Sequence, residues 1–153
     1  MPGEKSSHYK FMDAAYQQAL KSYNEGGLPI GSVLVRSNEI IGSGHNQRVQ
    51  KSDPIAHGEM DCLRNAGRQQ TYANTVLYTT LSPCMMCAGT IVQFKIPEVI
   101  IGESINFTGN KDFLASHGVK IIDLADEKCI DLMSKLIREK PQLWREDISE
   151  KVS

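Results

Sequence analysis

The chain has 153 residues, of which 41% are hydrophobic and 23% are charged, and this composition is typical of one soluble globular domain with a single buried core. No apolar run approaches the ~20 residues that span a bilayer, and residues 1–10 lack the apolar segment of a secretory signal, so we expect a cytoplasmic protein that can also reach the nucleus by diffusion. The formal net charge is −1 and no basic run occurs, so neither a nucleic acid nor a membrane is expected as a partner.

Hydrophobic periodicity predicts helices that alternate with strands. Apolar residues at helical spacing begin near Ser6, and Gly26 ends that helix. The expected elements are a helix at 6–25, strands at 32–35 and from 40, a helix at 59–67, a strand at 75–80, a helix opened by the cysteines at 84 and 87, a strand at 97–102, a helix at 111–117, a strand at 119–122, and helices at 126–140 and 142–150. Helices placed between strands imply a layered α/β domain with a largely buried mixed sheet.

Two cysteines in C-x-x-C spacing, Cys84 and Cys87, lie between two apolar runs. Ser82 suits an N-cap and Pro83 suits the first helical position, so we expect the cysteines to open a helix. Positions three apart share a helix face, which lets both thiols reach one metal ion. In a reducing compartment such a pair is more often metal-binding or redox-active than a disulfide.

A second cluster, His57-Gly58-Glu59, lies upstream. Together the clusters read His-x-Glu … Pro-Cys-x-x-Cys, which is the signature of zinc-dependent nucleobase deaminases. Residues two apart inside a helix point to nearly opposite sides. His57 and Glu59 can therefore face one site only if His57 precedes the helix and its backbone is not yet helical.

The residue types in these clusters predict a hydrolytic zinc site. Three protein ligands and one open position are typical of catalytic zinc, and His57, Cys84 and Cys87 supply three. Such a ligand set leaves the ion enough Lewis acidity to bring a bound water near pKa ~7. Glu59 fits a proton carrier between water, the ring nitrogen and the departing amine. We therefore predict a deaminase with one Zn²⁺ per subunit.

Other interpretations stay open on the residues alone. A zinc-stabilised binding module would need a fourth Cys or His ligand and no role for Glu59, and a redox pair would leave the His-x-Glu cluster unexplained. Asn46 follows a strand end, where turn chemistry is usual, but its amide would also suit the edge of a base. Residues without such companions are expected to be core thiols (Cys62 and Cys129) or surface and capping residues (His8, His45 and His117).

The chain resembles the cytidine deaminase superfamily, and within it the fungal cytosine deaminases, over its whole length. The segments that carry the resemblance are residues 25–31 (EGGLPIG), 44–46 (GHN), 57–59 (HGE), 77–84 (LYTTLSPC), 102–103 (GE), 106–107 (NF), 141–142 (PQ), Trp144 and 146–148 (EDI). The resemblance implies one deaminase domain over residues 1–153, with a central mixed five-stranded sheet in a three-layer α/β/α sandwich, and a homodimer. Residues 141–153 would form a lid over the active site.

The resemblance also implies a reaction and a set of substrate contacts. Free cytosine would be hydrolysed to uracil and ammonia in pyrimidine salvage, and 5-fluorocytosine would also be a substrate. The implied contacts are Asn46 and the Gly58 backbone at the base edge, Phe107 and Trp144 as walls, Asp147 at the amino group, Ile30 as the floor, and the backbone of Ser82 and Cys84. The alternative is a deaminase of guanine or of adenosine in tRNA, although an RNA substrate would need a positive surface around an open cleft. The chain departs from the family pattern at Ile55 and Arg145.

Overall fold

The computed structural model of the chain describes residues 2–150, with side chains from residue 7 onward. The predicted lid at 141–153 therefore extends three residues past the described part. The elements within it, in chain order, are α1 (Pro2–Asn24), β1 (Gly31–Arg36), β2 (Glu39–His45), α2 (Gly58–Ala66), β3 (Thr75–Thr79), α3 (Met85–Phe94), β4 (Glu98–Ile101), α4 (Lys111–Ser116), β5 (Lys120–Asp123), α5 (Glu127–Glu139) and α6 (Pro141–Asp147). None of these helices is both long and apolar enough to cross a bilayer.

The five strands form one mixed sheet in the order β2-β1-β3-β4-β5. β1 runs antiparallel to β2 and β3, whereas β3, β4 and β5 are parallel. Ser37 and Asn38 both have positive φ, 52° and 63°, which is the backbone of a two-residue type I′ hairpin turn. With this topology the start of β1 and the carboxyl ends of β2, β3 and β4 meet at one edge of the sheet.

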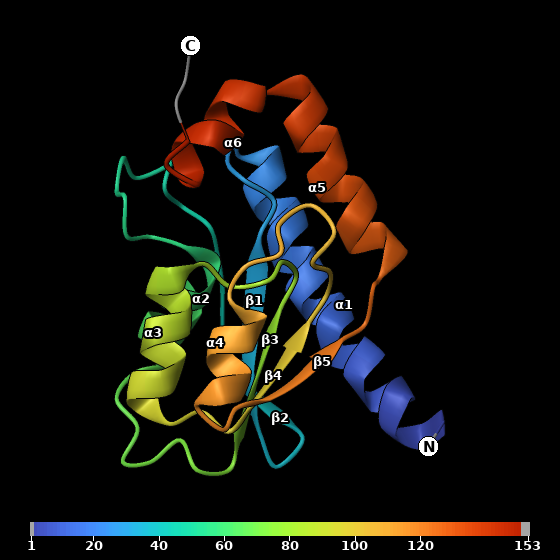
Figure 1. Cartoon of the computed structure of the whole chain (residues 1–153), viewed down its shortest axis with the longest axis vertical. Coiled ribbons are helices and arrows are strands. Elements are labelled where there is room, and N and C mark those ends of the chain that lie inside the picture. The colour runs from blue at the N-terminus through green and yellow to red at the C-terminus, as the bar shows by residue number, and fades with distance from the viewer. Residues whose placement is uncertain (1, 151–153) are drawn as a thin grey trace.

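Helices cover both faces of the sheet, as Figure 1 shows. Because successive side chains of a strand point to opposite faces, neighbouring residues enter different cores. Leu34, Leu77 and Val99 pack with residues of α2, α3 and α4. Val33, Tyr78 and Ile100 pack instead with residues of α1 and α5. The predicted three-layer α/β/α sandwich with a mixed five-stranded sheet is therefore confirmed.

Helix α2 lies unusually close to β2, because two glycines of the strand face it. A Cβ atom at Gly42 would come 2.5 Å from the Cβ of Ala66, and one at Gly44 would overlap the backbone nitrogen of Cys62. Normal contacts between carbon atoms are about 3.5–4.0 Å. The absence of side chains at both positions brings the start of α2 to the edge where the strands end.

Three helix boundaries differ clearly from the sequence prediction, and one of them is the end of α6, which lies at Asp147 and not at residue 150. Helix α1 begins at Pro2 and not near Ser6. Helix α3 begins at Met85, with Cys84 as its extended N-cap residue (φ −71°, ψ 175°). Ser82 does not cap α3, because its hydroxyl donates to the carbonyl oxygen of Thr108 at 2.8 Å. The predicted N-cap at Ser82 and first helical residue at Pro83 are therefore wrong by two residues.

The predictions for the remaining cysteines are confirmed, because Cys62 and Cys129 are 0% and 4% exposed. The prediction that His45 lies at the surface is wrong. His45 closes β2 and is buried, with its Nε2 atom 2.9 Å from Oε1 of Glu25. Its backbone N–H also donates to the carboxylate of Asp61 at 3.0 Å. The strand continues through His45 where sequence reasoning expects a turn, and this continuation places Asn46 at the sheet edge.

Candidate active site

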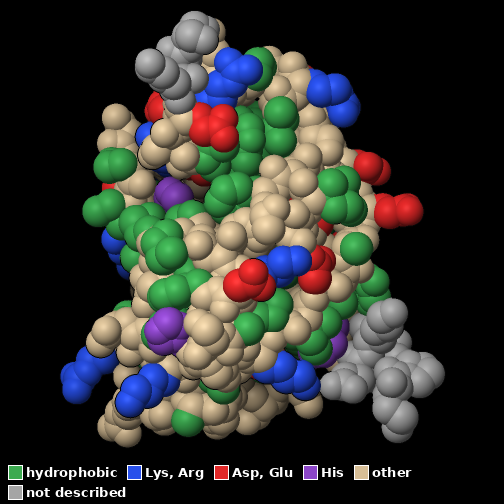
Figure 2. Space-filling model, in the orientation of Figure 1, with side chains coloured by type: hydrophobic (Ala, Val, Ile, Leu, Met, Phe, Trp, Pro, Cys, Tyr) green, Lys and Arg blue, Asp and Glu red, His purple; other side chains and the backbone are tan. Residues whose placement is uncertain are grey.

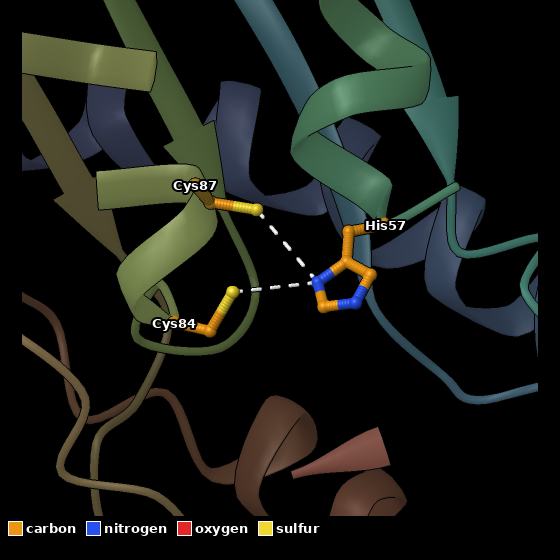
Figure 3. A group of neighbouring side chains, drawn as sticks. All are labelled: His57, Cys84 and Cys87. Carbon is orange, nitrogen blue, oxygen red and sulfur yellow. Dashed lines mark hydrogen bonds between the residues drawn. The ribbon is translucent and has the colours of Figure 1, made fainter. Parts of the chain in front are cut away.

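His57, Cys84 and Cys87 lie together at this edge of the sheet. The Nδ1 atom of His57 is 3.5 Å from Sγ of Cys84 and 3.8 Å from Sγ of Cys87, as Figure 3 shows. All three ligand atoms lie within 4.8 Å of one another. His57 is the N-cap residue of α2 and has an extended backbone (φ −71°, ψ 161°). It therefore precedes the helix, as the geometry of the His-x-Glu cluster requires.

These three residues fit a zinc ion. Zinc bonds of about 2.3 Å to sulfur and 2.0–2.1 Å to nitrogen in a tetrahedron place the sulfur and nitrogen atoms about 3.5 Å apart. The two observed distances are 3.5 and 3.8 Å. Among the described residues the group contains no fourth cysteine or histidine. A closed structural site would need one, so the arrangement is that of a site with an open position.

The two cysteines differ in acidity. The hydrogen bond from the Cys87 thiol lowers the pKa of Cys84 to about 4, although burial opposes this effect. The same hydrogen bond, together with burial, raises the pKa of Cys87 well above its usual value. Burial lowers the pKa of His57, but the hydrogen bond with Cys84 and the nearby Asp147 carboxylate outweigh this effect and bring the pKa to about 9. Without a metal, only one of the three ligand atoms is therefore readily deprotonated at neutral pH.

Glu59 lies in the first turn of α2, only 4% exposed, and its side chain faces the same site. Burial, reinforced by the negative charge of Cys84, raises the pKa of Glu59 to about 7. A carboxyl group with a pKa near the working pH can both accept and donate a proton, which suits general acid–base catalysis.

A small cavity joins these groups to the end of the chain. Its volume is about 20 Å³, which is room for roughly one water molecule. Its lining residues are Ile30, His57, Glu59, Leu81, Ser82, Cys84, Phe107, Trp144, Asp147 and Ile148. Most of the residues predicted from the sequence therefore surround one space. Leu81 and Ile148, which complete the wall, are apolar residues that carry no chemical signature in the sequence.

The loop after β4 that carries Phe107 is organised by a buried acid. Glu103 is fully buried, and its carboxylate accepts hydrogen bonds from the backbone N–H groups of Ile105 (2.8 Å) and Asn106 (3.0 Å). It also accepts one from the Asn106 side chain at 2.9 Å. The hydrogen bond from Ser82 to Thr108 ties the far end of the loop to the chain before Cys84. Sequence reasoning assigns Glu103 no role, because a buried carboxylate in a loop has no local pattern.

Asn46 and Gly58 are not among the residues that line the cavity. Asn46 is fully buried, and its Oδ1 atom accepts a hydrogen bond from the backbone N–H of Arg48 at 3.0 Å. Its Nδ2 atom has no hydrogen-bond partner among the described residues. A Cβ atom at Gly58 would come 3.0 Å from the carbonyl oxygen of Ile30, so the helix start packs directly on the segment before β1. The Asn46 side chain nevertheless lowers the pKa of Asp147, so its amide lies beside a carboxyl group that lines the cavity.

Helix α6 brings an aromatic ring and an acid to the cavity. Trp144 is 7% exposed and meets the ring of Phe107 edge-on, with 5.8 Å between ring centroids. The Oδ1 atom of Asp147 lies 3.8 Å from Nε2 of His57. Burial raises the pKa of Asp147, while His57 and Arg48 act in the opposite direction. The two departures from the family pattern lie at exposed positions outside the cavity lining, Ile55 and Arg145.

Comparisons with known proteins agree with this site. The family model for the cytidine and deoxycytidylate deaminase zinc-binding region matches residues 5–103. The cytosine deaminase of Candida albicans is 51% identical over 144 residues, which cover 92% of this chain and 96% of that protein. A tRNA-specific adenosine deaminase of Streptococcus pyogenes is 38% identical over 117 residues, 74% of each chain. A solved structure from a study of A-to-I editing by tRNA:A34 deaminases superposes with a TM-score of 0.71 at 25% identity, covering 81% of this chain and 99% of that one.

Proposed function

Because the chain belongs to the cytidine and deoxycytidylate deaminase family, we propose that it hydrolyses free cytosine to uracil and ammonia with one zinc ion per subunit. The observation that carries this proposal is the cavity in which His57 and Cys84 of the three-residue cluster face the buried carboxyl groups of Glu59 and Asp147. The likeness to a cytosine deaminase extends over 92% of this chain and 96% of that protein. The same chemistry extends to 5-fluorocytosine, which has the same reacting edge.

The chain's own residues account for the proton movements. His57, Cys84 and Cys87 would hold the zinc ion, which when bound would supply the Lewis acidity that makes water a nucleophile near neutral pH. Glu59 takes a proton from the attacking water, whose oxygen bonds to the ring carbon bearing the amino group, and passes it to the adjacent ring nitrogen. Glu59 then moves the proton of the added hydroxyl group to the amino nitrogen. The electron pair on the deprotonated oxygen forms the carbonyl bond of uracil, the carbon–nitrogen bond breaks, and ammonia leaves with the bonding electron pair.

Recognition of the base falls to side chains from several elements. The rings of Phe107 and Trp144 wall the pyrimidine, and the carboxylate of Asp147 accepts a hydrogen bond from its amino group. The unpartnered Nδ2 of Asn46 suits the carbonyl oxygen of the base, because a buried donor without a partner is costly unless a ligand pairs with it. The backbone of Gly58, Ser82 and Cys84, and the side chain of Ile30, complete the pocket.

Residues 141–153 act as a lid. A cavity of about 20 Å³ is too small for a pyrimidine, so walls must part to admit one. Outside it lies a hollow of about 430 Å³ lined by residues on both sides of α6's last turn, among them Arg48, Met85, Phe107 and Asp147. Movement of α6 away from Phe107 would join the two spaces.

A substrate panel tests the proposal directly. The protein is incubated with cytosine, cytidine, adenine, guanine and tRNA, and ammonia release is followed. We expect turnover of cytosine; activity on cytidine or tRNA without activity on cytosine would overturn the proposal. The tRNA reading has weaker support, because the likeness to the tRNA enzymes covers less of the chain. On the face seen in Figure 2, acidic and basic side chains are both scattered, and basic ones do not gather into one continuous area.

We also propose that the protein is a homodimer of the cytoplasm, with a share in the nucleus. Two large apolar side chains near the site are well exposed, Met85 at 54% and Ile105 at 71%, and a second subunit would cover such surface. Light scattering after size exclusion should give twice the 17.0 kDa chain mass. Microscopy of a fluorescently tagged chain checks the location.

A further inference from the structure

We infer that Arg48 is a positioning residue that clamps α6 over the base site and holds Asp147 in place. This inference rests on the proposed function. The Nη1 atom of Arg48 donates to Oε1 of Glu146 at 2.5 Å, and its Nε atom lies 3.9 Å from Oδ1 of Asp147. One guanidinium group thus joins the segment after β2 to the last turn of α6, 98 residues further along the chain.

Arg48 is anchored on the side away from α6. Its backbone N–H donates to Oδ1 of Asn46, so the Nδ2 donor is the part of that amide left to act on Asp147, whose pKa the Asn46 side chain lowers. The carbonyl oxygen of Asn46 is held in turn by the hydroxyl of Ser22 at 2.7 Å and the side-chain amide of Gln50 at 3.0 Å. Helix α1 therefore fixes the segment that carries Asn46 and Arg48, and α6 is the part that can move.

The contacts of α6 with Arg48 differ in burial. The side chain of Glu146 is 56% exposed, whereas that of Asp147 is 6% exposed and that of Arg48 is 18% exposed. A pair with one exposed partner contributes little to global stability and is screened by salt. Asp147 Oδ1 makes no hydrogen bond among the described residues, and its charged neighbours are His57 at 3.8 Å and Arg48 at 3.9 Å. The side-chain amide of Asn46 also lies close enough to lower the pKa of Asp147. We therefore expect the Arg48 side chain to affect the position of Asp147 in the site more than the global stability of the protein.

This clamp determines the fraction of molecules in which α6 is closed over the base site. When only a fraction of molecules is closed, the apparent affinity for substrate falls by that fraction. If loss of the clamp lowers the closed fraction to about one fifth, the KM for cytosine rises about fivefold. Glu59 and the three ligand residues lie at the starts of α2 and α3, and none of them belongs to α6 or to the segment that carries Arg48, so kcat should change less than KM.

The test compares Arg48→Met with wild type, because methionine keeps much of the stem and removes the guanidinium. We expect about a fivefold or larger rise in KM with a smaller fall in kcat, and unchanged zinc content and melting temperature. Arg48→Lys should recover part of the affinity, since a lysine keeps the charge but cannot reach both carboxylates in fork geometry. The matched control is Arg145→Met, which removes an exposed arginine from α6 and should leave KM unchanged.

A double-mutant cycle measures the coupling. Glu146→Gln should raise KM less than Arg48→Met does, and the double variant should be no worse than Arg48→Met alone. Additive effects of the two substitutions would overturn the clamp.

Trp144 supplies a readout that does not depend on turnover, because it is the single tryptophan of the chain and lies on α6. Acrylamide should quench its fluorescence more strongly in Arg48→Met than in wild type. Added salt should increase quenching in wild type only. A protein that fails to deaminate cytosine but shows these quenching effects would overturn the proposed function and keep the clamp. A protein that deaminates cytosine, with the same KM and quenching in both forms, would overturn the clamp alone.

Discussion

Glu59→Gln separates the catalytic role of this carboxyl group from its effect on stability. The substitution keeps the size of the side chain but removes its ability to carry a proton. We expect turnover to fall about 10²- to 10⁴-fold, the usual contribution of a positioned acid–base group. This loss corresponds to about 3–5 kcal/mol of activation free energy. Zinc should remain bound, because Glu59 is not in the cluster of ligand atoms.

The same substitution should stabilise the metal-free protein. Burial raises the pKa of Glu59 from 4.5 to about 7, and a difference of about 2.5 units corresponds to about 3 kcal/mol. Between these pH values the folded state keeps a proton that the unfolded state releases, so stability falls as pH rises through this window. Glutamine cannot ionise. The variant should therefore gain up to about 3 kcal/mol at pH 8 and nothing below pH 4.5.

The assay combines ammonia release, zinc content by atomic absorption, and urea unfolding of chelator-treated protein at two pH values. Glu39→Gln serves as the control, because Glu39 is exposed at the hairpin turn and its substitution should change neither turnover nor zinc content. A Glu59→Gln variant that keeps more than a tenth of wild-type turnover would refute the proton-carrier role. Equal unfolding free energies for variant and wild type at both pH values would refute the cost assigned to burial.

Three further predictions follow from the site. Cys84→Ser should lose zinc, whereas Cys62→Ala, which removes a buried thiol outside the cluster, should keep it, as metal analysis can show. Zinc binding to the metal-free protein at pH 7 should release about two protons, from His57 and Cys87, and affinity should rise with pH; calorimetry in buffers of different ionisation enthalpy measures this, and no release would contradict the pKa order. Removal of residues 144–153 should leave a folded zinc protein, as circular dichroism can show, with poor activity in the ammonia-release assay. Full activity would exclude the tail from the site.

Local patterns made much of this architecture predictable. The mixed sheet follows from helices placed between short apolar strands, and each pattern spans only a few residues. The pairing of His57 with Cys84 and Cys87 follows from two short motifs whose spacing fixes which side chains share a helix start. Local preference gave a wrong prediction at Ser82. This residue type often caps a helix, but the Ser82 hydroxyl instead donates a hydrogen bond to the carbonyl oxygen of Thr108 across the loop.

Contacts between segments that are distant in the sequence could not be predicted from local residue patterns. Helical spacing alone would leave Asp147 facing solvent, and it is buried only because α6 folds back over the edge of the sheet. His45 is buried for the same kind of reason, since Glu25 reaches it from the end of α1. The Arg48 pair with Glu146 joins segments 98 residues apart, and no short motif records such a pair.

The two glycines of β2 that face α2 have a consequence for metal affinity. A methyl group at Gly42 or Gly44 would push the helix away by about 1 Å to restore normal carbon contacts. Metal–ligand bonds tolerate errors of only about 0.2 Å. His57 is the N-cap residue of α2, whereas both cysteines lie at the start of α3. The affinity for zinc therefore depends on two glycines of β2 that are not zinc ligands. A single alanine at either position would move His57 relative to the two cysteines and weaken zinc binding.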